Sequence, residues 1–158
     1  MRRDLLDKVE GVVSTPHTTE QKLLEICRLL VDEVEHYDWV GFYLVDPAVD
    51  HELVLGPYVG EPTEHTRIAF GAGICGQAAA NEATFIIQDV TQESNYLSCS
   101  PAVQSEIVVP IFAAGKVIGE LDIDSHALAP FTEDDHLLLE AIAERVSQLL
   151  APAAGRST

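Results

Sequence analysis

The sequence predicts a single α+β domain in which an antiparallel sheet of about six strands carries the N-terminal and C-terminal helices on one face. A length of 158 residues is typical of one domain with its own core. Apolar residues recur at helical spacing near both ends of the chain, whereas the middle alternates between apolar and polar residues in short segments. Turns of the hairpin type separate these segments, which favours antiparallel pairing.

The N-terminal part of the chain predicts two helices. A short one lies within residues 1–17, which we separate from the main domain of residues 18–150. Thr18 begins the second helix, because Gln21 three residues later completes the pattern of a capping box. Cys27 lies on the apolar stripe of this helix, so we interpret it as a core residue.

The central part predicts strands, because from Asp38 onward the apolar period changes to two. The glycine-rich stretch 71–81 predicts a tight turn that opens a short helix, and residues 91–104 predict a polar surface loop. Thr132 is placed to cap the last helix, and residues 151–158 are expected to form a disordered tail. The predicted strands cover residues 38–46, 52–58, 66–70, 84–90, 105–112 and 117–124.

The charge balance excludes several classes of function. The chain has 26 acidic and 9 basic side chains, a net charge of −17, and so lacks the basic footprint that binds nucleic acids or anionic membranes. No run approaches the roughly 18 apolar residues of a membrane span, and the N-terminus lacks an apolar signal core. We therefore expect a cytoplasmic protein with reduced cysteines. A solvated surface and adaptation to high salt both explain the acidic charge.

The last two predicted strands form a hairpin whose register follows from its turn. A three-residue loop at 113–115, with its glycine in the left-handed position, pairs Glu106 with Asp122. Alternation then places the apolar side chains of both strands on one face and the acids on the other. Asp124 and Glu120 share the acidic face.

Acids gathered on one sheet face have two explanations. Trp39 and Tyr43 share one face of the first predicted strand, and aromatic rings beside carboxylates can form a cup for an amine. If that face is buried, the carboxylates cannot all ionise, and one with a raised pKa can act as a general acid. The other explanation is a solvated outer face of the sheet, on which the cluster has no chemical role.

Two cysteines lie in settings that suggest reactivity. Cys75 sits in GAGICG, where a glycine turn meets a helix N-terminus that favours the thiolate, and Cys99 lies in the polar loop. The alternative is two unrelated cysteines, one packed and one exposed. The spacing of the histidines and cysteines matches no metal motif, although His65 could converge with both thiols. We therefore predict neither a metal site nor a cofactor.

The chain contains, in order, the segments DWVGFYLVD, ELVLGPYVG, RIAFGAGICGQAA, NYLSCSPAVQSEIVVPIF and GELDIDS followed by FTEDD. In this combination they resemble the free methionine-(R)-sulfoxide reductases, which are stand-alone GAF domains. The resemblance covers the chain from about Thr18 to Leu150. It is more specific than a general GAF match, because both cysteines, SEIV and DIDS occur together.

The resemblance implies roles for the cysteines and the acids. Cys99 corresponds to the loop cysteine that attacks the sulfoxide sulfur, and Cys75 to the cysteine of the glycine turn. Glu106, Asp122 and Asp124 correspond to acids that hold the substrate amine and protonate the sulfoxide oxygen. Of these, Glu106 or Asp124 is the implied proton donor.

The same resemblance makes Trp39 and Tyr43 the aromatic wall of the substrate pocket. After methionine leaves, the sulfenic acid on Cys99 forms a disulfide with Cys75, which thioredoxin or a similar dithiol reduces. Free methionine sulfoxide and this reductant are thus the implied partners, and a homodimer is left open.

One position departs from the family pattern. Many members carry a third motif cysteine ten residues before the turn cysteine, where it acts as the resolving thiol, and this chain has His65 there. Under the family chemistry, Cys75 or an external thiol must therefore resolve the sulfenic acid. The alternative function is a non-catalytic GAF domain that senses a small molecule or a redox state.

Overall fold

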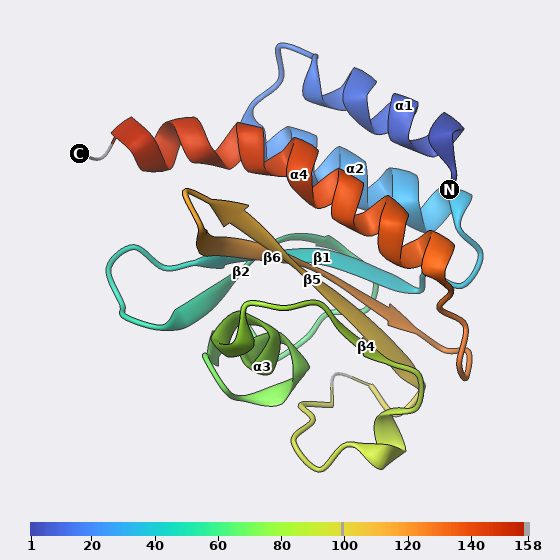
Figure 1. The fold of residues 1–158 in the computed structure, drawn as a ribbon. Helices are drawn as coiled ribbons and strands as arrows, with labels where there is room; N and C mark the ends of the chain where they lie inside the picture. Colours follow the sequence, from blue (N-terminus) through green and yellow to red (C-terminus); the bar gives the residue numbers. More distant parts are fainter. Residues whose placement is uncertain (99, 157–158) are drawn as a thin grey trace.

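The computed structural model describes residues 1–98 and 100–156. They form a six-stranded sheet in the order β3-β2-β1-β6-β5-β4, and every neighbouring pair is antiparallel (Figure 1). The predicted α+β class is confirmed. The strands are β1 (Trp39–Val45), β2 (Glu52–Val59), β3 (Arg67–Ala69), β4 (Phe85–Ile87), β5 (Ser105–Ala113) and β6 (Lys116–Ser125).

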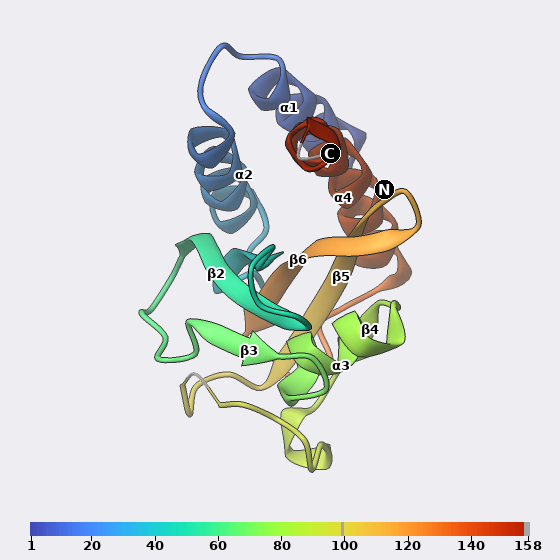
Figure 2. The ribbon, with the colours of Figure 1, turned by 90° about the vertical axis from the view of Figure 1, so that its left-hand side faces the viewer.

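The helices lie on both sides of this sheet. Figures 1 and 2 show α2 and α4 on one face, with α1 against their outer side, and α3 on the opposite face. The predicted packing of the terminal helices on one face is therefore confirmed. None of the helices in the described part of the chain combines the length and apolarity that crossing a bilayer needs. The helices are α1 (Arg3–Val13), α2 (Thr19–Glu33), α3 (Gly73–Asn81) and α4 (Glu133–Arg156), with a short 3-10 turn η1 (Val90–Gln92).

The start of α2 is the predicted capping box. The backbone N–H of Gln21 donates to Thr18 Oγ1 at 3.1 Å, and the N–H of Thr18 donates to Gln21 Oε1 at 3.0 Å. Cys27 has no exposed surface and belongs to the core between the helices and the sheet. Cys27 is therefore a core residue, as predicted, and burial raises the pKa of its thiol.

The C-terminal helix begins directly after Thr132 and is anchored by a buried acid. The Asp135 carboxylate accepts hydrogen bonds from the Tyr37 hydroxyl at 2.6 Å and from the Thr132 N–H at 2.8 Å. The sequence carries no local signal for the contact with Tyr37, because the two residues are 98 positions apart. Helix α4 continues to Arg156, past the expected start of the tail at residue 151, and the disorder of that tail stays a prediction.

The register of the β5–β6 hairpin differs from the predicted one by two residues. Glu106 lies opposite Asp124 rather than Asp122, because a two-residue loop replaces the predicted three-residue loop and the register shifts again between Ile111 and Phe112, where Ile118 of β6 is an extra residue. The loop residues Ala114 and Gly115 both have positive φ, 50° and 76°, as a type I′ turn requires. The predicted pair is wrong, but a shift of two leaves Glu106 and the acids of β6 on their predicted face. Nearer the turn the shift is one residue, so Val117 lies opposite Phe112 and its predicted pairing with Ile111 is also wrong.

The two faces of the sheet carry different side chains. The face under α2 and α4 is aliphatic and includes Ile107 and Leu121. The face towards α3 carries Trp39, Tyr43 and the acids, and the exposed fraction of each acid is at most 6%. A solvated outer face is therefore excluded as the explanation of the acid cluster. The exposed fractions are 6% for Glu106, 0% for Glu120, 3% for Asp122 and 2% for Asp124.

Candidate active site

The glycine turn before α3 lets this helix approach the sheet closely enough to bury Cys75. Gly73 has a φ of +63°, and a Cβ there would lie 2.8 Å from the Leu97 side chain. A Cβ at Gly76 would lie 2.5 Å from the backbone oxygen of Ala69. Because neither position has room for a side chain, α3 can hold Cys75 against the acids, where the cysteine is 4% exposed.

Asn95 fastens the segment 91–104 to this turn. Its Oδ1 accepts a hydrogen bond from the Gly73 N–H at 2.9 Å, and its Nδ2 donates to the Gly71 carbonyl oxygen at 2.8 Å. Sequence reasoning missed Asn95, because an asparagine in a polar loop is by itself an ordinary turn residue. Asn95 thus ties its part of the segment to the turn that begins α3.

Four carboxylates from β5 and β6 meet beneath α3. Glu106 of β5 lies opposite Asp124, while Glu120 and Asp122 precede Asp124 on the same face of β6. The thiol of Cys75 reaches towards this group, with its Sγ 3.9 Å from Glu106 Oε2. One potential ligand atom from each of Cys75, Glu106 and Asp122 lies within 4.8 Å of the other two. These three residues could therefore also bind a metal ion.

Burial changes the protonation of these groups. Loss of solvent raises the pKa of Glu120, Asp122 and Asp124, and the charge of Asp122 raises the pKa of the other two further. The pKa of the Cys75 thiol is also well above its usual value, because the thiol is buried and lies beside Asp122. The expected thiolate at Cys75 is therefore wrong, because burial and the neighbouring acids favour the protonated thiol.

Trp39 and Tyr43 of β1 flank the acids. Trp39 lies opposite Asp124 in the β1–β6 ladder, and Tyr43 lies opposite Glu120. The Trp39 ring stacks on Tyr58 of β2, with ring centroids 5.4 Å apart and an interplanar angle of 19°. Sequence reasoning missed Tyr58, because the β1–β2 register shifts near this point and strand alternation does not reveal such a shift.

Two small cavities, of about 10 Å³ and about 30 Å³, lie on this face. The segment 91–104 contributes to the walls of both. Each is far smaller than an amino-acid ligand, so the site is closed around its own side chains. The first is lined by residues that include Tyr43, His65, Cys75, Leu97, Glu106 and Asp122, and the second by residues that include Trp39, Ser100, Val103 and Asp124.

The structure thus collects most of the predicted site residues on one buried face. The proposed nucleophile, Cys99, lies outside the described residues. The residues brought together are Trp39, Tyr43, Cys75, Glu106, Asp122 and Asp124.

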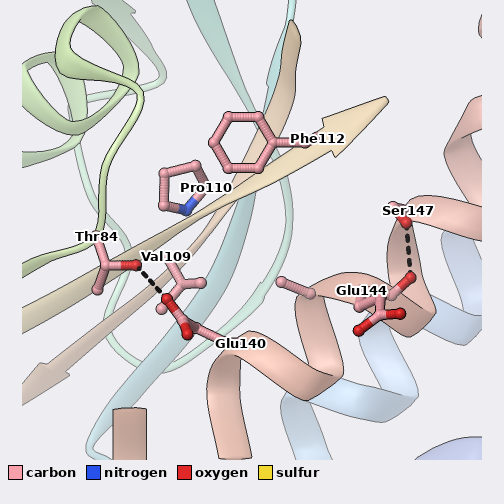
Figure 3. A pocket seen from close by; sticks show the side chains of 8 residues that line it. Thr84, Val109, Pro110, Phe112, Glu140, Glu144 and Ser147 are labelled. Carbon is pink, nitrogen blue, oxygen red and sulfur yellow. Dashed lines mark hydrogen bonds between the residues drawn. The ribbon is translucent and has the colours of Figure 1, made fainter. Parts of the chain in front are cut away.

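Larger hollows lie elsewhere. A groove of about 190 Å³ runs between β5 and α4, where Thr84 Oγ1 donates to Glu140 Oε2 at 3.2 Å and Phe112 forms part of the wall (Figure 3). A cavity of about 570 Å³ is lined by residues that include His51 and Lys116. The described residues around these two hollows include none of the predicted site residues, so size does not locate the chemistry.

Comparison with known proteins agrees with this geometry. A family model for the GAF domain matches residues 18–151. GAF domain-containing protein A of Dictyostelium discoideum is 39% identical over 139 residues, which are 88% of this chain and 85% of that protein. The free methionine-R-sulfoxide reductase of Escherichia coli is 37% identical over 123 residues, which are 78% of this chain and 72% of that protein.

A solved structure extends the likeness to nearly the whole chain. The free methionine-R-sulfoxide reductase from Neisseria meningitidis, in complex with its substrate, superposes with a TM-score of 0.89 and is 38% identical, covering 99% of this chain and 91% of that chain. This chain therefore belongs to the GAF domain family and, within it, to the free methionine-(R)-sulfoxide reductases.

Proposed function

We propose that this chain reduces free methionine-(R)-sulfoxide to methionine, with the Cys99 thiolate as nucleophile and Cys75 as resolving thiol. Family membership supports the reaction. The observation that carries the assignment of residues is the buried group of Cys75, Glu106 and Asp122 next to the segment 91–104, which bears Cys99. A thiol, protonated acids and aromatic rings on one closed face are the groups that this chemistry needs.

The ammonium group of a free amino acid suits the buried acids. Asp122 and Asp124 are 3% and 2% exposed, and a buried carboxylate is unfavourable unless a cation or hydrogen-bond donors compensate it. The substrate ammonium provides that compensation, with the rings of Trp39 and Tyr43 beside it. A methionine sulfoxide within a peptide has no such ammonium group, so the proposed substrate is the free amino acid.

Reduction begins when the Cys99 thiolate attacks the sulfoxide sulfur. A protonated acid, Glu106 or Asp124, donates its proton to the sulfoxide oxygen. The oxygen passes to Cys99 as a sulfenic acid and methionine leaves, so the substrate sulfur gains the two electrons that the Cys99 sulfur loses.

Cys75 then resolves the sulfenic acid. Its sulfur attacks the Cys99 sulfur, the hydroxyl leaves as water and a disulfide forms. The raised pKa keeps Cys75 protonated at rest, and Glu106, 3.9 Å from Sγ, is within reach to accept the proton as Cys75 reacts. Thioredoxin or a similar dithiol reduces the disulfide, and we place the cycle in the cytoplasm, where such reductants act.

Turnover of the separate sulfoxide stereoisomers tests this function. The purified protein is incubated with free R or S methionine sulfoxide and dithiothreitol, and methionine is quantified by chromatography. We expect methionine from the R isomer alone, activity at background in Cys99→Ser, and unchanged activity in Cys27→Ala, the matched thiol control. Methionine from neither isomer, together with tight binding of a small molecule, would favour a sensory GAF domain instead.

Two further measurements test the finer parts of the proposal. N-acetylmethionine sulfoxide lacks the ammonium group, so we expect its kcat/KM to be far below that of free methionine sulfoxide. Equal turnover of the two compounds would contradict the assigned role of the acids. Light scattering of the same sample tests whether the chain forms the homodimer that the sequence analysis leaves open.

A further inference from the structure

We propose that Cys75, Glu106 and Asp122 bind a thiophilic divalent cation of the Zn²⁺ class, and that the bound ion inhibits the reductase. The inhibitory consequence rests on the proposed function, whereas the metal site rests only on the geometry of these three residues. The ion would be a regulator that competes with substrate, not a participant in the reaction.

The spacing of the three side chains suits a four-coordinate ion. Their potential ligand atoms lie within 4.8 Å of one another, and Cys75 Sγ is 3.9 Å from Glu106 Oε2. With Zn–S near 2.3 Å and Zn–O near 2.1 Å, tetrahedral ligands lie about 3.3 to 3.7 Å apart. Each atom therefore has to move by about 1 Å or less, which side-chain rotation can supply.

Unpartnered oxygens provide a second, independent observation. Within the described residues, Asp122 Oδ1 and both carboxylate oxygens of Glu120 have no hydrogen-bond partner, although Asp122 is 3% exposed and Glu120 is fully buried. Buried acceptors in folded proteins are nearly always satisfied, so these oxygens indicate that protons or a cation complete the site. Glu120 lies close enough to Cys75 to raise the pKa of its thiol, without belonging to the ligand set itself.

The ligand types select the class of ion. A thiolate favours Zn²⁺ and Cd²⁺ over Mg²⁺ and Ca²⁺, which prefer sites made only of oxygen. Three protein ligands leave a fourth position for water. The adjoining cavity of about 10 Å³ has room for a single small species of that kind. His65 and Leu97 line the same cavity.

When the ion binds, Cys75 releases its thiol proton and the site loses two of its functions. The thiolate held by the metal cannot attack the sulfenic sulfur of Cys99. Asp122 is then engaged with the metal and cannot receive the substrate ammonium, and Glu106 can no longer transfer a proton. Zn²⁺ should therefore raise the apparent KM for free methionine sulfoxide, and a chelator should reverse the effect.

Titration of the reduced protein with Cd²⁺ tests the site directly. Cadmium thiolates have an ultraviolet charge-transfer band, which reports metal–sulfur bonding without any assay of activity. We expect one saturable step per chain that is lost in Cys75→Ser and retained in Cys99→Ser and Cys27→Ala. We also expect Asp122→Asn to weaken Cd²⁺ binding at least about tenfold, which is about 1.4 kcal/mol, and the exposed control Asp50→Asn to leave it unchanged.

The outcomes separate the two proposals. A Cd²⁺ band that persists in Cys75→Ser, or no band at all, overturns the metal site even if the metal-free protein reduces sulfoxide. A normal band in a protein without turnover removes the reductase proposal and leaves the metal site standing. Inhibition by Zn²⁺ is measured with a phosphine reductant, because dithiols chelate zinc. If Asp122→Asn does not fold, as judged by circular dichroism, Cys75→Ser alone decides the question.

Discussion

His65 Nε2 lies 3.0 Å from the carbonyl oxygen of Ser98 and donates a hydrogen bond to it, which joins the loop before β3 to the segment that carries Cys99. The carbonyl can only accept, so Nε2 carries the proton. The backbone of His65 is held in turn by the Tyr43 hydroxyl, which donates to the His65 carbonyl oxygen at 2.8 Å. The residue that departs from the family pattern therefore positions the segment next to the candidate nucleophile.

Removal of this contact should impair the reaction more than the fold. We expect His65→Ala to lower kcat/KM about fivefold, the equivalent of one hydrogen bond of about 1 kcal/mol. His65→Gln, whose amide can donate from a similar position, should recover most of the loss. A drop in thermal stability with kcat/KM intact would assign His65 a purely structural role.

Cys75→Ser should stop the cycle after the first turnover. With thioredoxin and its reductase as the only reductants, we expect about one methionine per chain, because the Cys99 sulfenic acid lacks its resolving thiol. Rapid-quench measurement of methionine gives the size of this burst. Continuous turnover in Cys75→Ser would show that an external thiol resolves Cys99.

The double variant His65→Cys, Cys75→Ser tests the departure at position 65 directly. It places a cysteine where many family members have their resolving thiol. In the present structure the side chain at this position is hydrogen-bonded to the Ser98 carbonyl oxygen. Restored multiple turnover would show that this loop can supply the resolving thiol. A single turnover would show that only α3 presents a thiol in the required position.

Glu120 should make the protein less stable as the pH rises. Burial raises its pKa above 4.5, so the folded protein keeps this proton to a higher pH than the unfolded chain does. The stability linked to the proton is complete below about pH 4.5 and is lost as the pH rises through the folded-state pKa. Glu120→Gln cannot ionise and should escape this loss.

Urea unfolding of Glu120→Gln and of the parent protein between about pH 5 and 9 measures the effect. The difference in free energy of unfolding should grow with pH, by about 1.4 kcal/mol for each pH unit between the unfolded-state and the folded-state pKa of Glu120. Glu144→Gln is the control, because Glu144 is 73% exposed. A pH-independent difference for Glu120→Gln would contradict the raised pKa.

Ala114→Asn should stabilise the β5–β6 hairpin. Ala114 has a φ of 50°, which strains a residue with a Cβ, whereas Asn-Gly is the preferred pair in a type I′ turn. We expect a gain of about 0.5 to 1 kcal/mol in the free energy of unfolding. Ala113→Asn, one residue earlier in β5, should give no gain, and a gain there instead would support the three-residue loop that the sequence predicts.

The β5–β6 hairpin shows which structural features the sequence alone predicts and which it does not. Strand alternation placed Glu106, Asp122 and Asp124 on one face correctly, because the two-residue period depends only on local backbone geometry. The facing pairs were wrong, because a non-glycine residue in the left-handed conformation and an irregularity in a strand leave no clear signal in the sequence. The resemblance of motifs supplied the family, which the comparisons confirm.

The sequence by itself determined that the acids share one strand face, that Thr18 caps α2 and which family the chain belongs to. Only the tertiary structure decided that the acidic face is buried and that Cys75 is a high-pKa thiol. The physical reason is desolvation, which depends on what covers a side chain. Here the cover is α3, brought close by Gly73 and Gly76, and the segment that Asn95 and His65 attach to the acid-bearing face.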